Sequence, residues 1–149
     1  MNLAALLQHL PTVAVRGDLD REVDHVTQDS RGAGPTTVFV AISGGRADGH
    51  DFVASVTAAA VVVERDVAAP PGAVVVRVID TRAALASLSA ALYGHPSRAM
   101  KVVGVTGTNG KTTITTMAEA ALTHAGRAVG RIGTTGNAIM GRPRPTVFT

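Results

Sequence analysis

Residues 104–113 read Gly-Val-Thr-Gly-Thr-Asn-Gly-Lys-Thr-Thr, a glycine-rich stretch whose composition suits phosphate binding. It follows the apolar pair Val102–Val103 and precedes a helix-like segment over 113–125. Glycines let the backbone turn tightly and expose N–H groups to phosphate oxygens, and a helix start adds further N–H donors. In such a loop Lys111 would reach the β- and γ-phosphates of a nucleotide, and the Thr112 hydroxyl would ligate Mg²⁺.

The loop departs by one residue from the general phosphate-loop pattern, which has two glycines separated by four residues before Lys-Thr. Val105 stands where the first glycine is expected, and Gly104 lies one position early. An ordinary glycine turn that caps a helix, with Lys111 in solvent, is the alternative. The apolar strand before the loop and the helix after it favour phosphate binding.

The first hundred residues alternate between strand-like and helix-like patterns, which indicates an α/β fold. Short apolar runs typical of buried strands occur at 23–27, 38–42, 61–63 and 74–79. Helical patterns occur at 3–10 after a capping Asn2, from 50 to about 60, and from Asp80 or Thr81 to Gly94.

Residues 95–99 read as a linker, so we place a domain boundary between 97 and 98. The apolar face of the following helix is formed by Met117, Ala118, Ala121, Leu122 and Ala125. With a strand at 128–132, residues 102–132 would form the first βαβ unit of a phosphate-loop-type domain. One such unit cannot cover both faces of a parallel sheet, so we expect the second domain, 98–149, to be truncated and the chain to be a fragment.

Composition narrows the classes of function. Hydrophobic residues make up 46% of the 149 residues, aromatic residues only 3%, and the net charge is +3. Few aromatic side chains argue against nucleic-acid binding, which uses base stacking. The chain has no cysteine, no basic signal region at its start and no apolar stretch long enough to span a membrane, so we expect a soluble, cytoplasmic protein. The five histidines show no metal-ligand spacing.

The loop sequence Thr-Gly-Thr-Asn-Gly-Lys-Thr-Thr resembles the ATP loop of the Mur ligases and their folylpolyglutamate synthetase relatives. Upstream, Asp29-Ser30-Arg31 and the segment 44–52 resemble the amino-terminal domain shared by two Mur ligases. These are the tripeptide synthetase and the ligase that adds D-Ala-D-Ala. The segments 114–117 and 133–139 resemble the tripeptide synthetases.

This resemblance implies an ATP-dependent ligase of peptidoglycan synthesis that uses Mg²⁺. Such an enzyme adds lysine or meso-diaminopimelate to UDP-MurNAc-L-Ala-D-Glu through an acyl phosphate. Residues 1–97 would then bind the UDP-linked substrate, and 98–149 would begin the ATP-binding domain. The family's remaining domains lie beyond Thr149, so we expect the fragment alone to be inactive and to depend on the remainder of the same polypeptide.

The resemblance also implies roles for individual residues. The UDP part would contact Gln28 and Ser30, the loop around it would contain Gly45, Arg46 and Ala47, and Thr149 would contact the muramyl peptide. ATP would be held by Gly107, Thr108, Asn109, Gly110, Lys111, Thr112 and Thr113, with Lys111 acting on the transferred phosphate.

Several alternatives remain open at this point. Asp29-Ser30-Arg31 could be a turn in which the side chains bond their own backbone. Thr134, Thr135 and Asn137 could line the site or form an ordinary polar loop. For the whole protein, the competing functions are the D-Ala-D-Ala-adding Mur ligase, a non-catalytic nucleotide- or UDP-sugar-binding module and a plain phosphotransferase.

Overall fold

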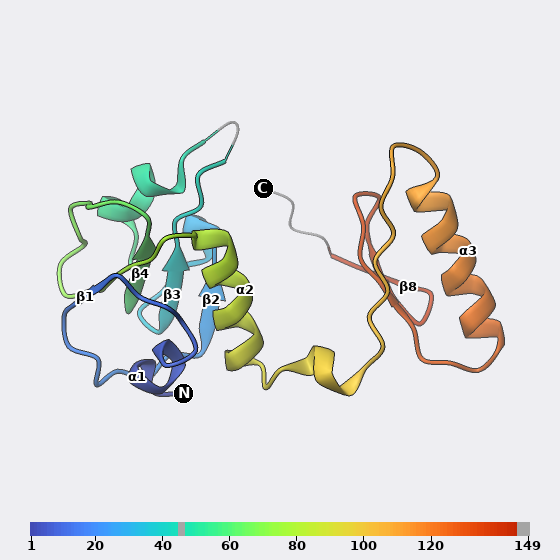
Figure 1. Ribbon diagram of the computed structural model, residues 1–149, viewed down its shortest axis with the longest axis horizontal. Helices are drawn as coiled ribbons and strands as arrows, with labels where there is room; N and C mark the ends of the chain where they lie inside the picture. Colours follow the sequence, from blue (N-terminus) through green and yellow to red (C-terminus); the bar gives the residue numbers. More distant parts are fainter. Residues whose placement is uncertain (45–46, 146–149) are drawn as a thin grey trace. The chain divides into compact units, whose positions relative to one another are not determined.

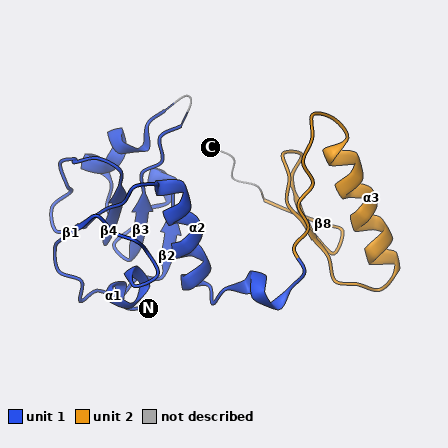
Figure 2. Cartoon of the chain, in the orientation of Figure 1, with its two compact units in different colours: residues 1–101 blue, residues 102–149 orange. Residues whose placement is uncertain are grey.

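A computed structural model describes residues 1–44 and 47–145, and the chain divides into two compact units, 1–101 and 102–149 (Figure 2). The boundary expected at 97–98 falls in the 3₁₀ helix η3 (Pro96–Ala99), near the end of unit 1. Within the described residues, no helix has the length and apolar character needed to cross a membrane.

A five-stranded sheet forms the centre of unit 1 (Figure 1). Its order is β1-β5-β4-β3-β2, and β2 to β5 run parallel while β1 is an antiparallel edge strand. The bounds are β1 Ala14–Arg16, β2 His25–Thr27, β3 Thr37–Val40, β4 Ala60–Val63 and β5 Val74–Arg77. The four predicted strands are thus present, with ends shifted by a few residues. The edge strand β1 was missed; it has three residues, all exposed, and its apolar run at 13–15 is short.

Two apolar clusters cover the two faces of this sheet. On one face, α1 (Leu3–Leu7) and α2 (Thr81–Leu92) pack residues such as Leu6 and Leu88 against alternate strand residues, among them Val62. On the other face, Phe39 and Val61 pack with Val53 of the 3₁₀ helix η2 (Gly49–Ser55). Burial on both faces explains why the inner strands are continuous runs of valine and alanine.

The helix predicted from residue 50 to about 60 is instead the short 3₁₀ helix η2. It ends because Val56 is extended and Ala59 already donates its N–H to the Thr37 carbonyl at 2.9 Å, at the entry to β4. The residues that would extend the helix are instead extended and pair with the parallel strand β3.

Aspartate or asparagine side chains cap α1, α2, η1 and η2 of unit 1. Asn2 accepts a hydrogen bond from the Ala4 N–H, and Asp80 accepts from the N–H groups of Arg82 and Ala83. Asp29 and Asp48 cap η1 (Ser30–Gly32) and η2 in the same way. These caps satisfy N–H groups that have no partner inside a helix.

Unit 2 contains α3 (Lys111–His124) and an antiparallel sheet of β6 (Gly130–Arg131), β7 (Asn137–Ile139) and β8 (Arg142–Arg144). The α/β class is confirmed, but the parallel βαβ arrangement expected over 102–132 is wrong. Residues 102–106 form no strand, because a strand needs a neighbour for its N–H and C=O groups. After β6 the chain turns at 133–136 and pairs β6 with β7, in a region expected to be loop.

The apolar side chains of unit 2 are largely exposed. Val103 is 83% exposed, Met117 67% and Ile132 87%, and the expected apolar face of α3 lies on the surface. Among the described residues of this unit, the buried ones are Glu119 and Ala138. Unit 2 thus lacks the kind of core that stabilises unit 1.

Replacing Gly49 by alanine should destabilise unit 1. A Cβ at this position would lie 2.6 Å from the backbone nitrogen of Ile42 and 2.9 Å from its carbonyl oxygen, and neither atom can move without shifting the end of β3. We expect a loss of about 2 kcal/mol or more in the free energy of unfolding, measured by urea denaturation. Gly32→Ala is the control, since no atom lies within 4 Å of the position that its new methyl group would take, and its stability should stay within about 0.5 kcal/mol of the parent. Equal stability of both variants would contradict the steric argument.

Candidate functional site

The loop at 107–113 has backbone conformations that require glycine. Gly107 has a φ of 142° and Gly110 a φ of 80°, and Gly110 occupies the N-cap position of α3. The first hydrogen bond of the helix runs from the Ile114 N–H to the Gly110 carbonyl at 2.9 Å. The N–H groups of the preceding three residues thus lie in the first turn, where a helix offers its donors to an anion.

The Lys111 side chain folds back over this loop. Its ammonium group donates to the carbonyl oxygens of Gly107 and Thr108, the latter at 3.1 Å, and the side chain is exposed. A positive charge therefore stands above the exposed glycine turn, where it suits a nucleotide phosphate. Thr112 and Thr113 follow in the exposed first turn of α3, and Asn109 is also exposed.

The expected substrate residues of unit 1 follow the carboxyl ends of its parallel strands. Gln28 and Ser30 come directly after β2, and Ala47 comes after β3. Parallel strands end at the same edge of a sheet, which is where α/β proteins bind ligands. Gln28 and Ala47 are exposed, and Ser30 is half-buried in η1. Gly45, Arg46 and Thr149 lie outside the described residues.

Asp29 and Arg31 form a self-bonded turn beside Ser30. The Asp29 carboxylate accepts from the Arg31 N–H at 3.0 Å and from its guanidinium at 2.8 and 2.7 Å. The Arg31 side chain and then its backbone N–H hold the pKa of Asp29 down at about 2. The turn is thus the one that Asp and Ser side chains favour locally, and contact of Ser30 with UDP stays a prediction.

A hydrogen-bond chain through the buried His50 and Thr81, not foreseen from the sequence, joins three strand ends at this edge. His50 lies between Asp48, whose carboxylate is 2.7 Å from Nδ1, and the Glu64 N–H, which donates to Nε2 at 3.0 Å. The Glu64 carboxylate in turn accepts from the N–H and the hydroxyl of Thr81, both at 2.8 Å. The sequence signal was the Asp48-Gly-His50 spacing in the loop that follows a buried strand.

These contacts define the charge states of the side chains in this hydrogen-bond chain. Hydrogen bonds from the His50 backbone and ring hold the pKa of Asp48 well below its ordinary value, and those from Thr81 lower the pKa of Glu64. Because Nε2 of His50 accepts a hydrogen bond from the Glu64 N–H, the ring proton must reside on Nδ1 and point to Asp48. The imidazole therefore connects the Asp48 carboxylate to the Glu64 backbone, while the Glu64 carboxylate bonds Thr81.

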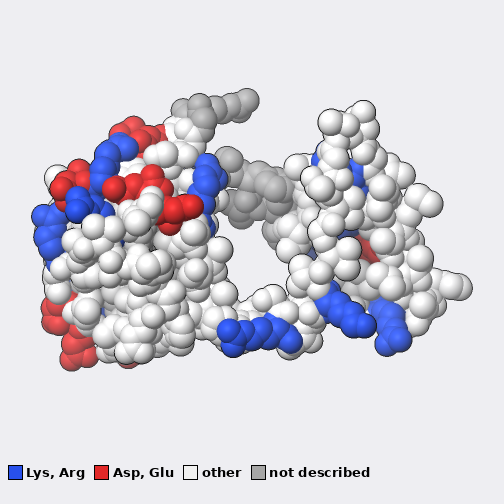
Figure 3. All heavy atoms as spheres, in the orientation of Figure 1, with Lys and Arg blue, Asp and Glu red and all other residues white. Residues whose placement is uncertain are grey.

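Charged side chains of both signs are interspersed on the visible face of unit 1 (Figure 3). Asp66 pairs with Arg16 and Arg77 at 3.1 and 3.3 Å, and Arg65 pairs with Asp48 at 2.8 Å. Exposed pairs such as those of Asp66 contribute little to stability. The Arg65–Asp48 pair instead places a guanidinium, whose charge Asp48 offsets, beside the candidate substrate edge.

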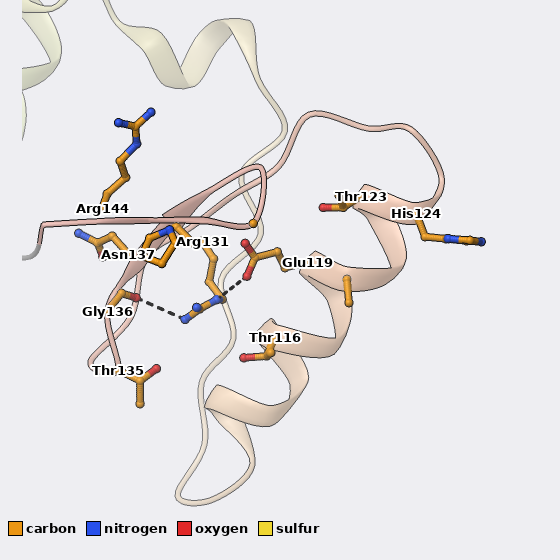
Figure 4. A pocket seen from close by; sticks show the side chains of 13 residues that line it. Thr116, Glu119, Thr123, His124, Arg131, Thr135, Gly136, Asn137 and Arg144 are labelled. Atoms are coloured by element: carbon orange, nitrogen blue, oxygen red, sulfur yellow. Dashed lines mark hydrogen bonds and ion pairs between the residues drawn. The ribbon is translucent and has the colours of Figure 1, made fainter.

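Unit 2 also contains a pocket of about 630 Å³ between α3 and the β6–β8 sheet (Figure 4). The Arg131 side chain crosses it, donating to Glu119 at 2.7 Å and to the Gly136 carbonyl at 3.3 Å. Thr135 and Asn137 line this pocket, whereas residues 107–113 do not. The structure thus places these two residues around a cavity separate from the phosphate loop. The Glu119–Arg131 pair was missed because Glu119 lies outside the predicted apolar face of the helix, where a glutamate is ordinarily exposed to solvent.

Unit 1 has a parallel α/β sheet and unit 2 has a glycine loop at a helix start, so the chain is an α/β protein with a candidate phosphate-binding loop. Two family models match the chain: "Mur ligase family, catalytic domain" over residues 22–93 and "Mur ligase middle domain" over residues 105–147. Together they account for most of the sequence. The chain therefore belongs to the Mur ligase family.

Curated relatives are named UDP-N-acetylmuramoyl-L-alanyl-D-glutamate–2,6-diaminopimelate ligase. The relative from Geobacter sulfurreducens is 43% identical, and the match covers 90% of this chain and 27% of the relative. The relative from Geobacillus thermodenitrificans is 39% identical, and the match covers 100% of this chain and 31% of the relative. The chain thus spans less than a third of the length of these relatives.

Solved structures of MurF ligases share the fold. One from Acinetobacter baumannii is 29% identical with a TM-score of 0.64, covering 83% of this chain and 27% of that one. The MurF ligase from Thermotoga maritima, in complex with ADP, is 28% identical with a TM-score of 0.57. This match covers 77% of our chain and 26% of the MurF chain.

Removing the Arg31 side chain should raise the pKa of Asp29 from about 2 toward, but not fully to, its ordinary value of 3.8. The shift should be incomplete because the residue-31 N–H still donates to the carboxylate. A lowered folded-state pKa stabilises the fold above the unfolded value, so this contribution should be lost as the pH falls from about 3.8 through 2. Carboxyl NMR titration of the parent and Arg31→Ala measures both pKa values. Identical pKa values would show that the guanidinium is not the cause.

Proposed function

We propose that the chain is the amino-terminal part of an ATP-dependent ligase that adds an amino acid to UDP-MurNAc-L-Ala-D-Glu. The observation that carries this proposal is the phosphate loop, with positive φ at Gly107 and Gly110 and Lys111 folded over it. The relatives in the preceding section supply the substrate class. Diaminopimelate is the amino acid in their names, and lysine is the alternative.

The residues of unit 2 suit the nucleotide and its metal. The ATP site would consist of Gly107, Thr108, Asn109, Gly110, Lys111, Thr112 and Thr113, with the first-turn N–H groups of α3 facing the phosphates. The exposed Thr112 hydroxyl suits Mg²⁺, which prefers oxygen ligands. Bound Mg²⁺ would neutralise phosphate charge, and the Lys111 ammonium would orient and stabilise the transferred phosphoryl group.

The proposed chemistry solves a specific problem, which is that a carboxylate is a poor electrophile. The substrate carboxylate oxygen attacks the γ-phosphorus of ATP, and ADP leaves. The amine of the incoming amino acid then attacks the resulting acyl phosphate, phosphate departs, and the amine loses a proton as the amide forms. Positioning and charge neutralisation are the protein's main contributions.

Unit 1 would bind the UDP-linked substrate through Gln28, Ser30, Gly45, Arg46 and Ala47, with Thr149 on the muramyl peptide. Its candidate edge lies at the carboxyl ends of parallel strands, and its arginines suit a diphosphate. Because the reaction consumes ATP and a UDP-linked precursor, we place the protein in the cytoplasm.

The exposed apolar residues of unit 2, including Val103 and Ile132, support dependence on further polypeptide. We accordingly propose that these 149 residues alone bind nucleotide but do not catalyse the ligase reaction. The D-Ala-D-Ala-adding ligase is the second candidate, because the MurF structures share the fold. The higher identity of the diaminopimelate ligases, over most of the chain, favours the first.

Lys111→Ala should weaken Mg²⁺-ATP binding by roughly 10- to 100-fold, because a hydrogen-bonded charge on the phosphates is lost. Isothermal titration calorimetry of the 149-residue chain measures this. Lys101→Ala is the matched control, since Lys101 is the other lysine of the chain, is exposed and lies outside the loop. Equal affinities for the two variants would refute the role of Lys111.

A chimera tests the ligase itself. This segment would replace the matched residues of the Geobacter sulfurreducens relative, and phosphate release would be followed with ATP, Mg²⁺ and candidate substrates. We expect release that requires UDP-MurNAc-L-Ala-D-Glu and diaminopimelate, and none from the 149 residues alone. Release with UDP-MurNAc-tripeptide and D-Ala-D-Ala instead would favour the second candidate. A folded chimera without any turnover would contradict both ligase proposals.

A further inference from the structure

His50 is a buried ionisable side chain to which the proposed reaction gives no role. Its side chain is 1% exposed, and both ring nitrogens are engaged, Nδ1 with Asp48 at 2.7 Å and Nε2 with the Glu64 N–H at 3.0 Å. An imidazole enclosed in this way cannot reach a substrate. Its two hydrogen bonds, however, join a loop to the end of a strand, which indicates that His50 positions this loop.

On the loop side, His50 holds the segment that leaves β3. Asp48 pairs with Ser43 in an isolated bridge, and its carboxylate accepts from the Ser43 hydroxyl at 3.2 Å. The Gly44 N–H donates to the Ala47 carbonyl at 2.9 Å. Both ends of the 43–48 segment are therefore fixed relative to the Asp48 carboxylate.

On the strand side, the anchor is rigid. Glu64 directly follows β4, and its carboxylate accepts two bonds from Thr81, which is fully buried at the start of α2. From the same helix, Arg82 donates to the Ser43 carbonyl at 3.1 Å. The imidazole is thus the buried link between the loop after β3 and the end of β4, and the exposed Arg82 contact adds a second link from α2 to the same loop.

We propose that His50 is a positioning residue for the UDP-linked substrate. By bonding Asp48 and the end of β4 at once, it orients Gly44 and Ala47 at the candidate substrate edge. This inference rests on the proposed substrate-binding role of unit 1 and adds to it the residue that shapes the edge. Its charged neighbours are Asp48, Glu64 and, through Asp48, Arg65.

Two substitutions separate the halves of the link. In His50→Asn, the amide nitrogen can replace Nδ1 as donor to Asp48, but the bond from Glu64 is lost. In His50→Gln, the amide oxygen can replace Nε2 as acceptor for the Glu64 N–H, but the ring bond to Asp48 is lost. If continuity of the link positions the edge, both variants should lose affinity.

The test titrates the 149-residue chain with UDP and, separately, with ADP. Binding is monitored in ¹⁵N NMR spectra. We expect each His50 variant to bind UDP roughly tenfold more weakly, the loss typical of one hydrogen bond, with ADP affinity unchanged. Val53→Ala is the control, because Val53 is fully buried on the same 3₁₀ helix but lies outside the link. It should lower the unfolding midpoint without changing UDP affinity.

A second measurement needs no variant. Saturating UDP should shift the amide signals of Gly44 and Ala47 and also that of Glu64, on the far side of the imidazole. UDP affinities within twofold of the parent in folded His50 variants, or an unmoved Glu64 signal, would overturn this inference alone. Failure of the parent chain to bind either UDP or UDP-MurNAc-L-Ala-D-Glu would overturn the proposed role of unit 1 as well.

Discussion

Parallel pairing of β2, β3, β4 and β5 is the constraint on which the rest of unit 1 depends. The inner strands β3, β4 and β5 are almost fully buried on both faces, and each step from one parallel strand to the next needs a crossover that covers the sheet. Parallel direction brings every strand's carboxyl end to one edge. The segments after β2, β3, β4 and β5 consequently meet there, although they are separated by up to about fifty residues in the sequence.

Carboxylates organise that shared edge. Asp29, Asp48, Glu64 and Asp80 each follow a strand and accept backbone N–H bonds that begin the next turn or helix. In Asp29, Asp48 and Glu64 these bonds lower the pKa and favour the ionised form, so the edge needs compensating positive charge. Arg31 and Arg65 supply it as ion pairs. The same residues thus cap helices and turns and determine the electrostatic character of the candidate substrate edge.

The two units differ in how much of their structure depends on distant contacts. Unit 1 closes a core between α1, α2, η2 and the sheet, whereas the apolar residues of unit 2 stay mostly exposed. The phosphate loop nevertheless has its characteristic backbone, because glycine conformations and the first turn of α3 are short-range properties. The candidate nucleotide site is therefore local in origin, while the candidate substrate edge is a product of the sheet.

The sequence by itself determined the features that arise from neighbouring residues: the α/β class, the four apolar strands, the caps at Asn2 and Asp80, and the glycine turn before α3. Tertiary structure decided the rest. It shortened the helix after Asp48, because β4 had to pair with β3, and left 102–106 without strand structure, because no neighbouring strand among the described residues pairs with them. It also joined His50 to Glu64 and Glu119 to Arg131. Such pairs depend on strand register and chain reversal, which periodicity and spacing along a sequence do not encode.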